Sequence, residues 1–371
     1  PEQIFTNYAR HIGIGGIATA GIIGIIKSFG VIKSAVGLAA NELTRKKSGD
    51  EAKVIRTQRD ISMKVIAIGI AITLAAVFVF FALGVVDNIW HAVVGLLIVG
   101  VIAFLFTTVA ANAIAIVGSN PVSGMTLMTL ILASLIMVAC GLNGTAGMTA
   151  ALIIGGVVCT ALSVAGALVT DLKIGYWIGS TPKVQETWKF LGTLVAAATV
   201  GGVMLVLNKT YGFTGENALV APQANAMVAV IEPMMNGGGA PWIMYGIGAA
   251  IAIVLTAFKV PALAFALGMF IPIDLNLPML VGGAISWFVS TRSKNTEVNA
   301  ARQEKGTLIA SGFIAGGALM GVVSAILKFA KVELAIPESP WTEPVAIIPY
   351  IAIIAFIIIY TLRPGKTGNK Q

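Results

Sequence analysis

The sequence predicts an all-α, polytopic integral membrane protein built as a helical bundle. Of its 371 residues, 57% are hydrophobic and only 11% are charged, and the mean hydropathy is +0.92. Ordinary globular domains carry about 25% charged residues. The chain also has 42 glycines, and glycine is commoner in membrane helices than in soluble ones. Its apolar runs are continuous rather than alternating, which disfavours a β-barrel.

Eleven apolar stretches are candidate membrane spans, judged against the roughly 20 residues that a helix needs to cross a bilayer. They cover residues 11–33, 61–83, 91–117, 122–140, 146–169, 187–207, 241–258, 261–273, 278–291, 307–328 and 344–362. The eighth and ninth are short and bracketed by prolines. These two could therefore be broken or re-entrant helices instead of full spans.

The basic residues are distributed unequally between the two ends of these spans. One end carries 18 of the 24 basic residues, and the other carries Arg10, Lys209, Lys328 and Lys331. The positive-inside rule then places the start of the chain outside and the C-terminus in the cytoplasm. It makes 41–60 a basic cytoplasmic loop and 208–240 an external loop. The net charge of +8 thus reflects topology and anionic membrane lipid, and we expect no nucleic-acid partner.

The external loop at 208–240 has two interpretations. Its second half alternates small apolar and amide side chains before a Pro and Gly ending. It could be a helix that lies on or dips into the outer surface. It could equally pack over the mouth of a transport pathway.

Enzyme motifs are absent from the sequence. There is no P-loop, no His-Glu-x-x-His, no Gly-x-Ser-x-Gly and no spaced acidic pair within one span. Cys140 and Cys159 both lie in apolar stretches, and no Cys/His cluster has the spacing of a zinc site. We therefore predict no enzyme activity, no cofactor and no bound metal.

The stretch VGSNPVSGMT, residues 117–126, interrupts the apolar pattern. Pro121 should end the preceding helix because it lacks an N–H and clashes with the carbonyl four residues earlier, and Asn120 is pushed out of helical geometry. Ser123 can then cap a new helix beginning near Gly124, leaving N–H groups that point at a polar or anionic group. Such a break is tolerated at membrane depth only inside protein or beside a cavity. The alternative is a tight cytoplasmic turn without a ligand.

A second interruption, KVPALAFALGMFIPIDLNLP, covers residues 259–278. Pro261 opens it, Pro272 ends its apolar piece, and Asp274 follows. Paired broken helices are a sequence indication of a transporter binding site. Two such breaks therefore favour a transporter over a purely structural bundle.

The third polar stretch is VTDLKIGYWIGSTPKVQE, residues 169–186. Asp171 and Lys173 follow a long, nearly uncharged region, and Tyr176 suits an interfacial aromatic belt. Ser180-Thr181-Pro182 predicts the start of a new helix with proline in its first turn. The stretch is either an interfacial anchor or a gating and coupling element in which Asp171 carries a proton.

These stretches together resemble the oligopeptide transporter (OPT) superfamily. Within it, the chain is similar to the bacterial and archaeal members that are related to the yellow-stripe-like transporters. The resemblance rests on SNPVSGMT, DLKIGYWIGSTPKVQ and VPALAFALGMFIP in that order, with APQAN at 221–225 and RTQRDISMKVI at 56–66. It covers about residues 5–362, and because family members are longer, the chain looks like their C-terminal portion. Ser62 stands where bacterial relatives often have Pro. The resemblance implies uptake of small peptides or metal–chelate complexes, driven by the proton gradient.

We therefore expect a secondary active transporter of the plasma membrane, with one transport domain over 1–371. The substrate should bind at the first break, where helix N–H groups meet a peptide carboxylate or a chelate. The expected binding or pathway residues are Asn112, Asn120, Pro121, Ser123, Gly124, Thr126, Gln223 and Asn225, and the expected coupling or gating residues are Asp171, Lys173 and Tyr176. The alternatives are a metal–chelate transporter and a membrane scaffold subunit that transports nothing. A homo-oligomer is left open.

Overall fold

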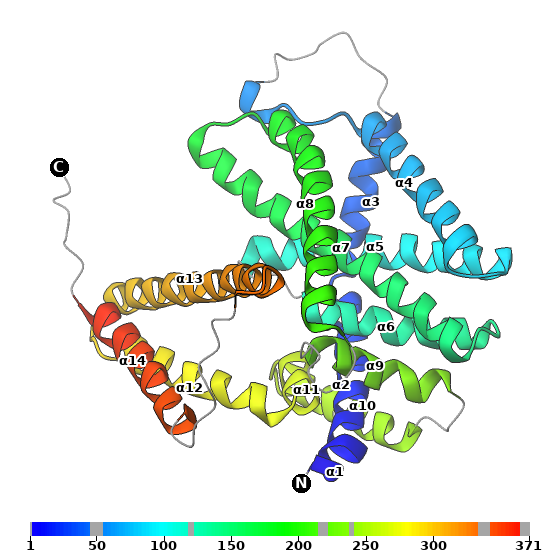
Figure 1. Ribbon diagram of the computed structural model, residues 1–371. Helices are drawn as coiled ribbons and strands as arrows, with labels where there is room; N and C mark the ends of the chain where they lie inside the picture. Colours follow the sequence, from blue (N-terminus) through cyan, green and yellow to red (C-terminus); the bar gives the residue numbers. More distant parts are fainter. Residues whose placement is uncertain are drawn as a thin grey trace. The chain divides into compact units, whose positions relative to one another are not determined.

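A computed structural model describes residues 2–44, 55–117, 122–213, 222–236, 241–332 and 342–363. Over these residues the regular structure is entirely helical, which confirms the predicted all-α class (Figure 1). The chain forms two compact units. Unit 1 comprises Pro1–Ala196 and Ala221–Pro272, and unit 2 comprises Ala197–Val220 and Ile273–Gln371. The expectation of one transport domain over 1–371 stays a prediction.

The helices follow the order of the predicted spans. Unit 1 contains α1 (Glu2–Ile4), the π-helix η1 (Phe5–Ala9), α2 (Arg10–Lys27), α3 (Phe29–Thr44), the 3-10 helix η2 (Arg56–Gln58), α4 (Met63–Gly84), α5 (Ile89–Val117), α6 (Val122–Ala139), α7 (Gly144–Ile178), the first half of α8 (Pro182–Tyr211), α9 (Pro222–Met235), α10 (Trp242–Ala257) and α11 (Ala262–Phe270). Unit 2 contains the rest of α8, α12 (Ile273–Ser290), α13 (Thr296–Phe329) and α14 (Thr342–Leu362).

Each of the eleven predicted spans contains a helix, but the first one is split. Ser28 leaves helical geometry with ψ near 3°, and its carbonyl accepts the amides of Val31 and Ile32. The stretch 11–33 is therefore the helix α2 followed by a new helix α3, not one continuous span. In the described part of the chain, six helices are long and apolar enough to cross a membrane. They cover Phe5–Lys27, Arg56–Gly84, Ile89–Ala115, Gly144–Ile178, Pro182–Tyr211 and Thr296–Phe329.

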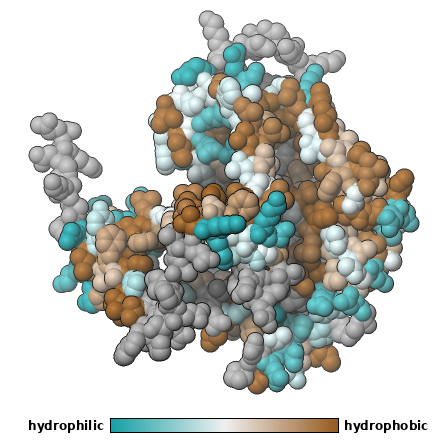
Figure 2. Space-filling view, in the orientation of Figure 1, coloured by the Kyte–Doolittle hydropathy of each residue, from teal (hydrophilic) through white to brown (hydrophobic). Residues whose placement is uncertain are grey.

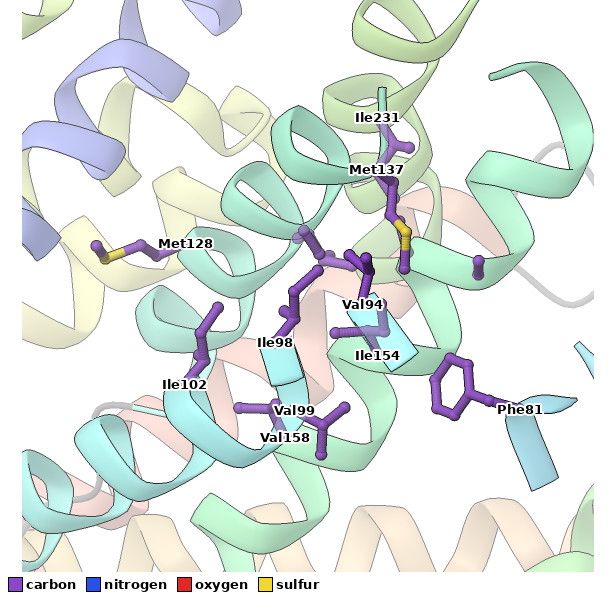
Figure 3. Packing of buried hydrophobic residues seen from close by; sticks show 14 of the residues in the cluster. Phe81, Val94, Ile98, Val99, Ile102, Met128, Met137, Ile154, Val158 and Ile231 are labelled. Carbon is purple, nitrogen blue, oxygen red and sulfur yellow. The ribbon is translucent and has the colours of Figure 1, made fainter. Parts of the chain in front are cut away.

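The larger core of unit 1 lies between α5, α6 and α7. Val94, Ile98 and Ile102 recur at helical spacing on one face of α5, where they are almost fully buried. They pack toward Ile154 and Val158 of α7 (Figure 3). Met137 of α6 and Ile231 of α9 complete the same cluster. This core fixes α7 against both α5 and α6.

A second core in unit 1 depends on glycine. A Cβ built on Gly15 of α2 would lie 2.1 Å from the carbonyl oxygen of Tyr245 in α10, and one on Gly248 would lie 1.9 Å from the carbonyl oxygen of Ile12. The two backbones therefore touch directly, as in membrane helix pairs that associate through small residues. Helix α11 lies on the same α2 surface, since a Cβ on Gly13 would come within 3.1 Å of Ala266 O.

The helices expose much of their apolar surface. Figure 2 shows hydrophobic residues spread over the face of the molecule in view. In the most apolar 18 residues of α8 no residue is buried, and in the most apolar 18 residues of α13 only 6% are buried. In a water-soluble protein an apolar surface this extensive would be a liability. In a bilayer it faces lipid, which supports the prediction of a polytopic membrane protein.

Unit 2 is packed more loosely than unit 1. Helices α12, α13 and α14 surround a cavity of about 180 Å³, and α8 and α13 border another of about 310 Å³. The first has polar side chains from all three helices in its lining, namely Ser286, Arg302, Gln303, Thr307 and Thr361, and the second is lined almost only by apolar residues. Lys305 donates a hydrogen bond to the carbonyl oxygen of Tyr360 at 2.8 Å, which ties α13 to α14.

The contact between α2 and α10 gives the first prediction. In Gly15→Ala the added methyl group meets backbone atoms that cannot move aside, so unit 1 should lose at least about 3 kcal/mol of stability, the upper end of overpacking costs. Gly24→Ala is the matched control in the same helix, because a Cβ there meets nothing within 4 Å. It should stabilise the helix by about 0.5–1 kcal/mol. Unfolding in mixed detergent measures both, and equal effects would contradict the glycine contact.

Candidate functional site

The first predicted break lies between α5 and α6. Helix α5 ends at Val117 and α6 begins at Val122. Asn120 and Pro121 lie outside the described residues, as does the side chain of Ser123. Ser123 belongs to the described helix, whereas the break itself and the cap that the sequence predicts for Ser123 stay predictions.

The start of α6 is buried against α11. Gly124 is buried, and a Cβ on it would lie 3.1 Å from Cδ2 of Leu263. Thr126 is 3% exposed. One turn further on, Leu127 shares a buried cluster with Ile14 of α2. Two of the predicted site residues thus lie in the interior of unit 1, beside the second break.

The second break frames a short helix. Helix α10 ends in a motif in which the Val260 amide donates to Leu255 O at 2.9 Å and Lys259 adopts a left-handed φ of 60°. Helix α11 follows Pro261 and ends before Ile271 and Pro272. Its nine residues span about 14 Å, less than half of the hydrocarbon core. The short stretch 261–273 is therefore a helical piece packed on α2, as the broken-helix interpretation predicts.

Helix α9 joins the same neighbourhood. Its Val230 is buried in the cluster that holds Leu127 of α6, and its last residue, Met235, packs at Gly147, where α7 begins. Figure 3 shows Ile231 beside Met137, near the end of α6. Helices α6 and α9 therefore begin at the same end of unit 1.

The remaining predicted binding residues lie near these helix ends. Gln223 and Asn225 fall in the first turn of α9, but their side chains are outside the described residues. Asn112 is partly buried five residues before the end of α5. The structure thus brings α6, α9 and α11 together, whereas the predicted substrate contacts of Asn112, Gln223 and Asn225 stay predictions.

A different set of polar residues meets at the turn between α7 and α8. Arg56 donates from Nη1 to Thr181 Oγ1 at 3.1 Å and from Nη2 to Gly179 O at 2.9 Å. The Lys183 amide donates to Arg59 O at 2.8 Å, and the Ile61 amide donates to Glu186 Oε2 at 2.9 Å. The segment 55–61 is thereby fastened to the start of α8. Two stretches that are far apart in the sequence, 56–66 and 169–186, become one polar site.

The predicted coupling residues belong to this second site. Asp171 forms an ion pair with Lys189 of α8, and its carbonyl accepts from Gln185 Nε2 at 3.4 Å. The Lys173 ammonium lies 5.5 Å from the ring centroid of Tyr176 and 5.4 Å from that of Trp177. Asp171 therefore holds two helices together, an interaction that its place among uncharged residues did not indicate.

Helix geometry separates the two sites. Leu130 of α6 packs at Gly155 of α7, which sets the two helices side by side. Asp171 lies about 24 Å further along α7, whereas Gly124 is only about 9 Å back along α6. Asp171 is thus roughly 15 Å beyond the first turn of α6 along the helix direction. Any link between protonation there and substrate at the break must pass through movement of the helices.

Sequence reasoning missed a third polar group. Where η1 passes into α2, the His11 ring lies 5.9 Å from the ring of Tyr245 in α10, and Arg10 precedes His11 in the chain. The isolated position of His11 suggests no more than an interfacial residue. A basic pair directly ahead of a glycine-rich helix was the available signal, but nothing in the sequence connects it with Tyr245.

Two comparisons with known proteins find relatives. Residues 1–328 match the family model described as OPT oligopeptide transporter protein. A Haemophilus influenzae protein named "Putative oligopeptide transporter" is 27% identical over 378 aligned residues, which cover 91% of this chain and 59% of that protein. The chain therefore spans about three-fifths of the length of the curated relative it matches. No solved structure matches.

The fastening of segment 55–61 gives the second prediction. Glu186→Ala removes the acceptor of the Ile61 amide. Hydrogen exchange at that amide should therefore accelerate about tenfold, which corresponds to a loss of ~1.4 kcal/mol in the free energy of local opening. Exchange followed by mass spectrometry of the peptide around residue 61 measures it. Glu186→Gln keeps an acceptor oxygen and should change the rate less. Unchanged exchange in Glu186→Ala would show that the segment is held without this bond.

Proposed function

We propose that this chain, which belongs to the OPT oligopeptide transporter family, carries out secondary active transport of small oligopeptides across the plasma membrane. The observation that carries the proposal is the contact of α6, next to the first predicted break, with the short helix α11. The start of α6 lies on α11, a nine-residue helix with a break at each end. Interrupted helices that meet inside a membrane protein are a recurrent way to build a transporter site.

Substrate would bind at the first turns of α6 and α9, with Asn120, Pro121, Ser123, Gly124 and Thr126 from the first break. The first N–H groups of a helix have no partner within the helix, and its dipole favours acceptor or anionic groups there. Asn112, Gln223 and Asn225 would supply amide groups for the peptide backbone. Gly124 lets the neighbouring side chain of Leu263 approach closely.

Protons would drive the transport through the ion pair of Asp171 and Lys189. Protonation of Asp171 removes its negative charge and with it the attraction that joins α7 to α8. Lys173 and Tyr176 would anchor the same end of α7 at the interface. The proposed topology places this end and the C-terminus in the cytoplasm, following the excess of basic residues there.

Two other functions remain distinguishable by experiment. A metal–chelate transporter of the yellow-stripe type would use the same helix breaks, so uptake of iron chelates measured beside di-, tri- and tetrapeptides separates it from a peptide transporter. A scaffold subunit would give no proton flux that depends on substrate in proteoliposomes.

The break itself is tested by substitution at its polar residues. Asn120→Ala and Ser123→Ala should each abolish peptide uptake into proteoliposomes while leaving membrane insertion intact. Ser163→Ala is the control, because Ser163 is an exposed serine on α7. Normal peptide uptake by both variants would show that Asn120 and Ser123 do not bind the substrate.

The coupling proposal is tested at Asp171. Asp171→Asn copies the protonated side chain, so uptake driven by a pH gradient should fall at least tenfold, whereas peptide exchange at equal pH should persist. Lys209→Gln, which removes an exposed charge from the last turn of α8, should retain driven uptake. Full gradient-driven uptake by Asp171→Asn would exclude this residue as the proton carrier.

A further inference from the structure

A cluster at the start of α2 contains buried polar atoms without partners. Arg10 Nε, His11 Nδ1 and the Tyr245 hydroxyl are all buried and make no hydrogen bond. Among the described residues only Ser134 Oγ and Gln185 Oε1 share this condition, so three of the five such atoms belong to two successive residues of α2 and to the tyrosine whose ring lies 5.9 Å from that of His11. Buried polar groups are almost always paired, and a concentration of unpaired ones calls for an explanation.

The cluster is held rigidly in place. Tyr245 is 8% exposed, and its backbone touches Gly15 so closely that no side chain fits between them. The Trp242 ring packs edge-on against the Tyr245 ring at 5.8 Å. On the other side Arg10 follows the π-helix η1 directly, with its guanidinium 5.1 Å from the ring centroid of Phe5. Single π-turns are frequent at functional sites.

The chemistry of the cluster suits a carboxylate. Arg10 carries a permanent positive charge and several N–H donors, the Tyr245 hydroxyl can donate, and the His11 ring can donate from Nδ1 in the appropriate tautomer. In the part of the chain that the structure describes, no acidic side chain pairs with Arg10. Hydrogen bonds between arginine and a carboxylate are among the strongest in proteins.

We propose that Arg10, His11 and Tyr245 bind the C-terminal carboxylate of the transported peptide. The inference rests on the proposed peptide transport and sharpens it, because it moves the carboxylate away from the α6 N-terminus. That terminus is then left for the carbonyl oxygens of the peptide backbone.

The two places are separated by a peptide-sized distance. A Cβ built on Gly21 of α2 would overlap Sδ of Met128, six residues after Val122, so Gly21 marks the level of the second turn of α6. Arg10 lies eleven residues earlier on α2, about 16 Å along the axis. An extended chain rises about 3.3–3.6 Å per residue, so a peptide of four to five residues reaches from one place to the other.

The test compares binding of one tetrapeptide in two forms. The full chain in nanodiscs is titrated with the radiolabelled free acid and with its C-terminal amide. The free acid should bind at least tenfold more tightly to the unaltered protein. Tyr245→Phe, which keeps the ring and removes only the hydroxyl, should weaken binding of the acid several-fold and leave the amide unchanged. Arg10→Gln should abolish the preference, and Arg10→Lys should restore part of it.

Matched controls separate this site from general effects. Tyr8→Phe removes the hydroxyl of a tyrosine that is 52% exposed near the same end of α2, and it should keep the full preference. A C-terminal amide that carries an aspartyl side chain should bind like the plain amide. If it binds like the free acid instead, the cluster does not recognise the terminal carboxylate.

Failure of this inference differs from failure of the proposed function. A preference for the free acid that survives in both Arg10→Gln and Tyr245→Phe overturns the carboxylate site and leaves peptide transport standing. Absence of binding of either peptide by the unaltered protein overturns both. Tyr245→Phe and Arg10→Lys conserve side-chain volume, and an unchanged thermal unfolding midpoint shows that each variant is folded.

Discussion

Direct backbone contact between α2 and α10 is the constraint on which the smaller core of unit 1 depends. In lipid there is no hydrophobic drive between helices, so close packing must hold them together. Gly15 and Gly248 permit an approach that any side chain would block. The same α2 surface receives α11 at Gly13, and α11 in turn supports Gly124 of α6. The contact between α6 and α11 therefore depends on the glycine-lined surface of α2.

Three polar places in unit 1 have distinct physical characters. The first turns of α6 and α9 offer helix N-termini, the start of α2 offers a fixed positive charge with unpaired donors, and the α7–α8 turn offers an ion pair bound to segment 55–61. The first two suit a substrate with carbonyl and carboxylate oxygens. The third joins α7 to α8 through the ion pair of Asp171 and Lys189.

The sequence predicted the helices well but not their partners. Hydrophobicity and proline marked the eleven spans and the short α11, because backbone groups in lipid must be satisfied within a helix and proline interrupts that pattern. Only the first span was wrongly predicted as one continuous helix, since Ser28 divides it into α2 and α3. Asp171 stood out by its charge, yet its ion pair with Lys189 depends on how α7 and α8 fold back on each other.

By itself the sequence determined the membrane class, the order of the helices, the short helix between Pro261 and Pro272, and the family, which the match over residues 1–328 confirms. These follow from local chemistry, in which each residue acts on its own segment. Only the tertiary structure decided that α11 lies on α2, that Gly124 of α6 lies against α11, and that His11 meets Tyr245, more than 230 residues later in the chain. Contacts between distant segments depend on shape complementarity, and no local pattern encodes it.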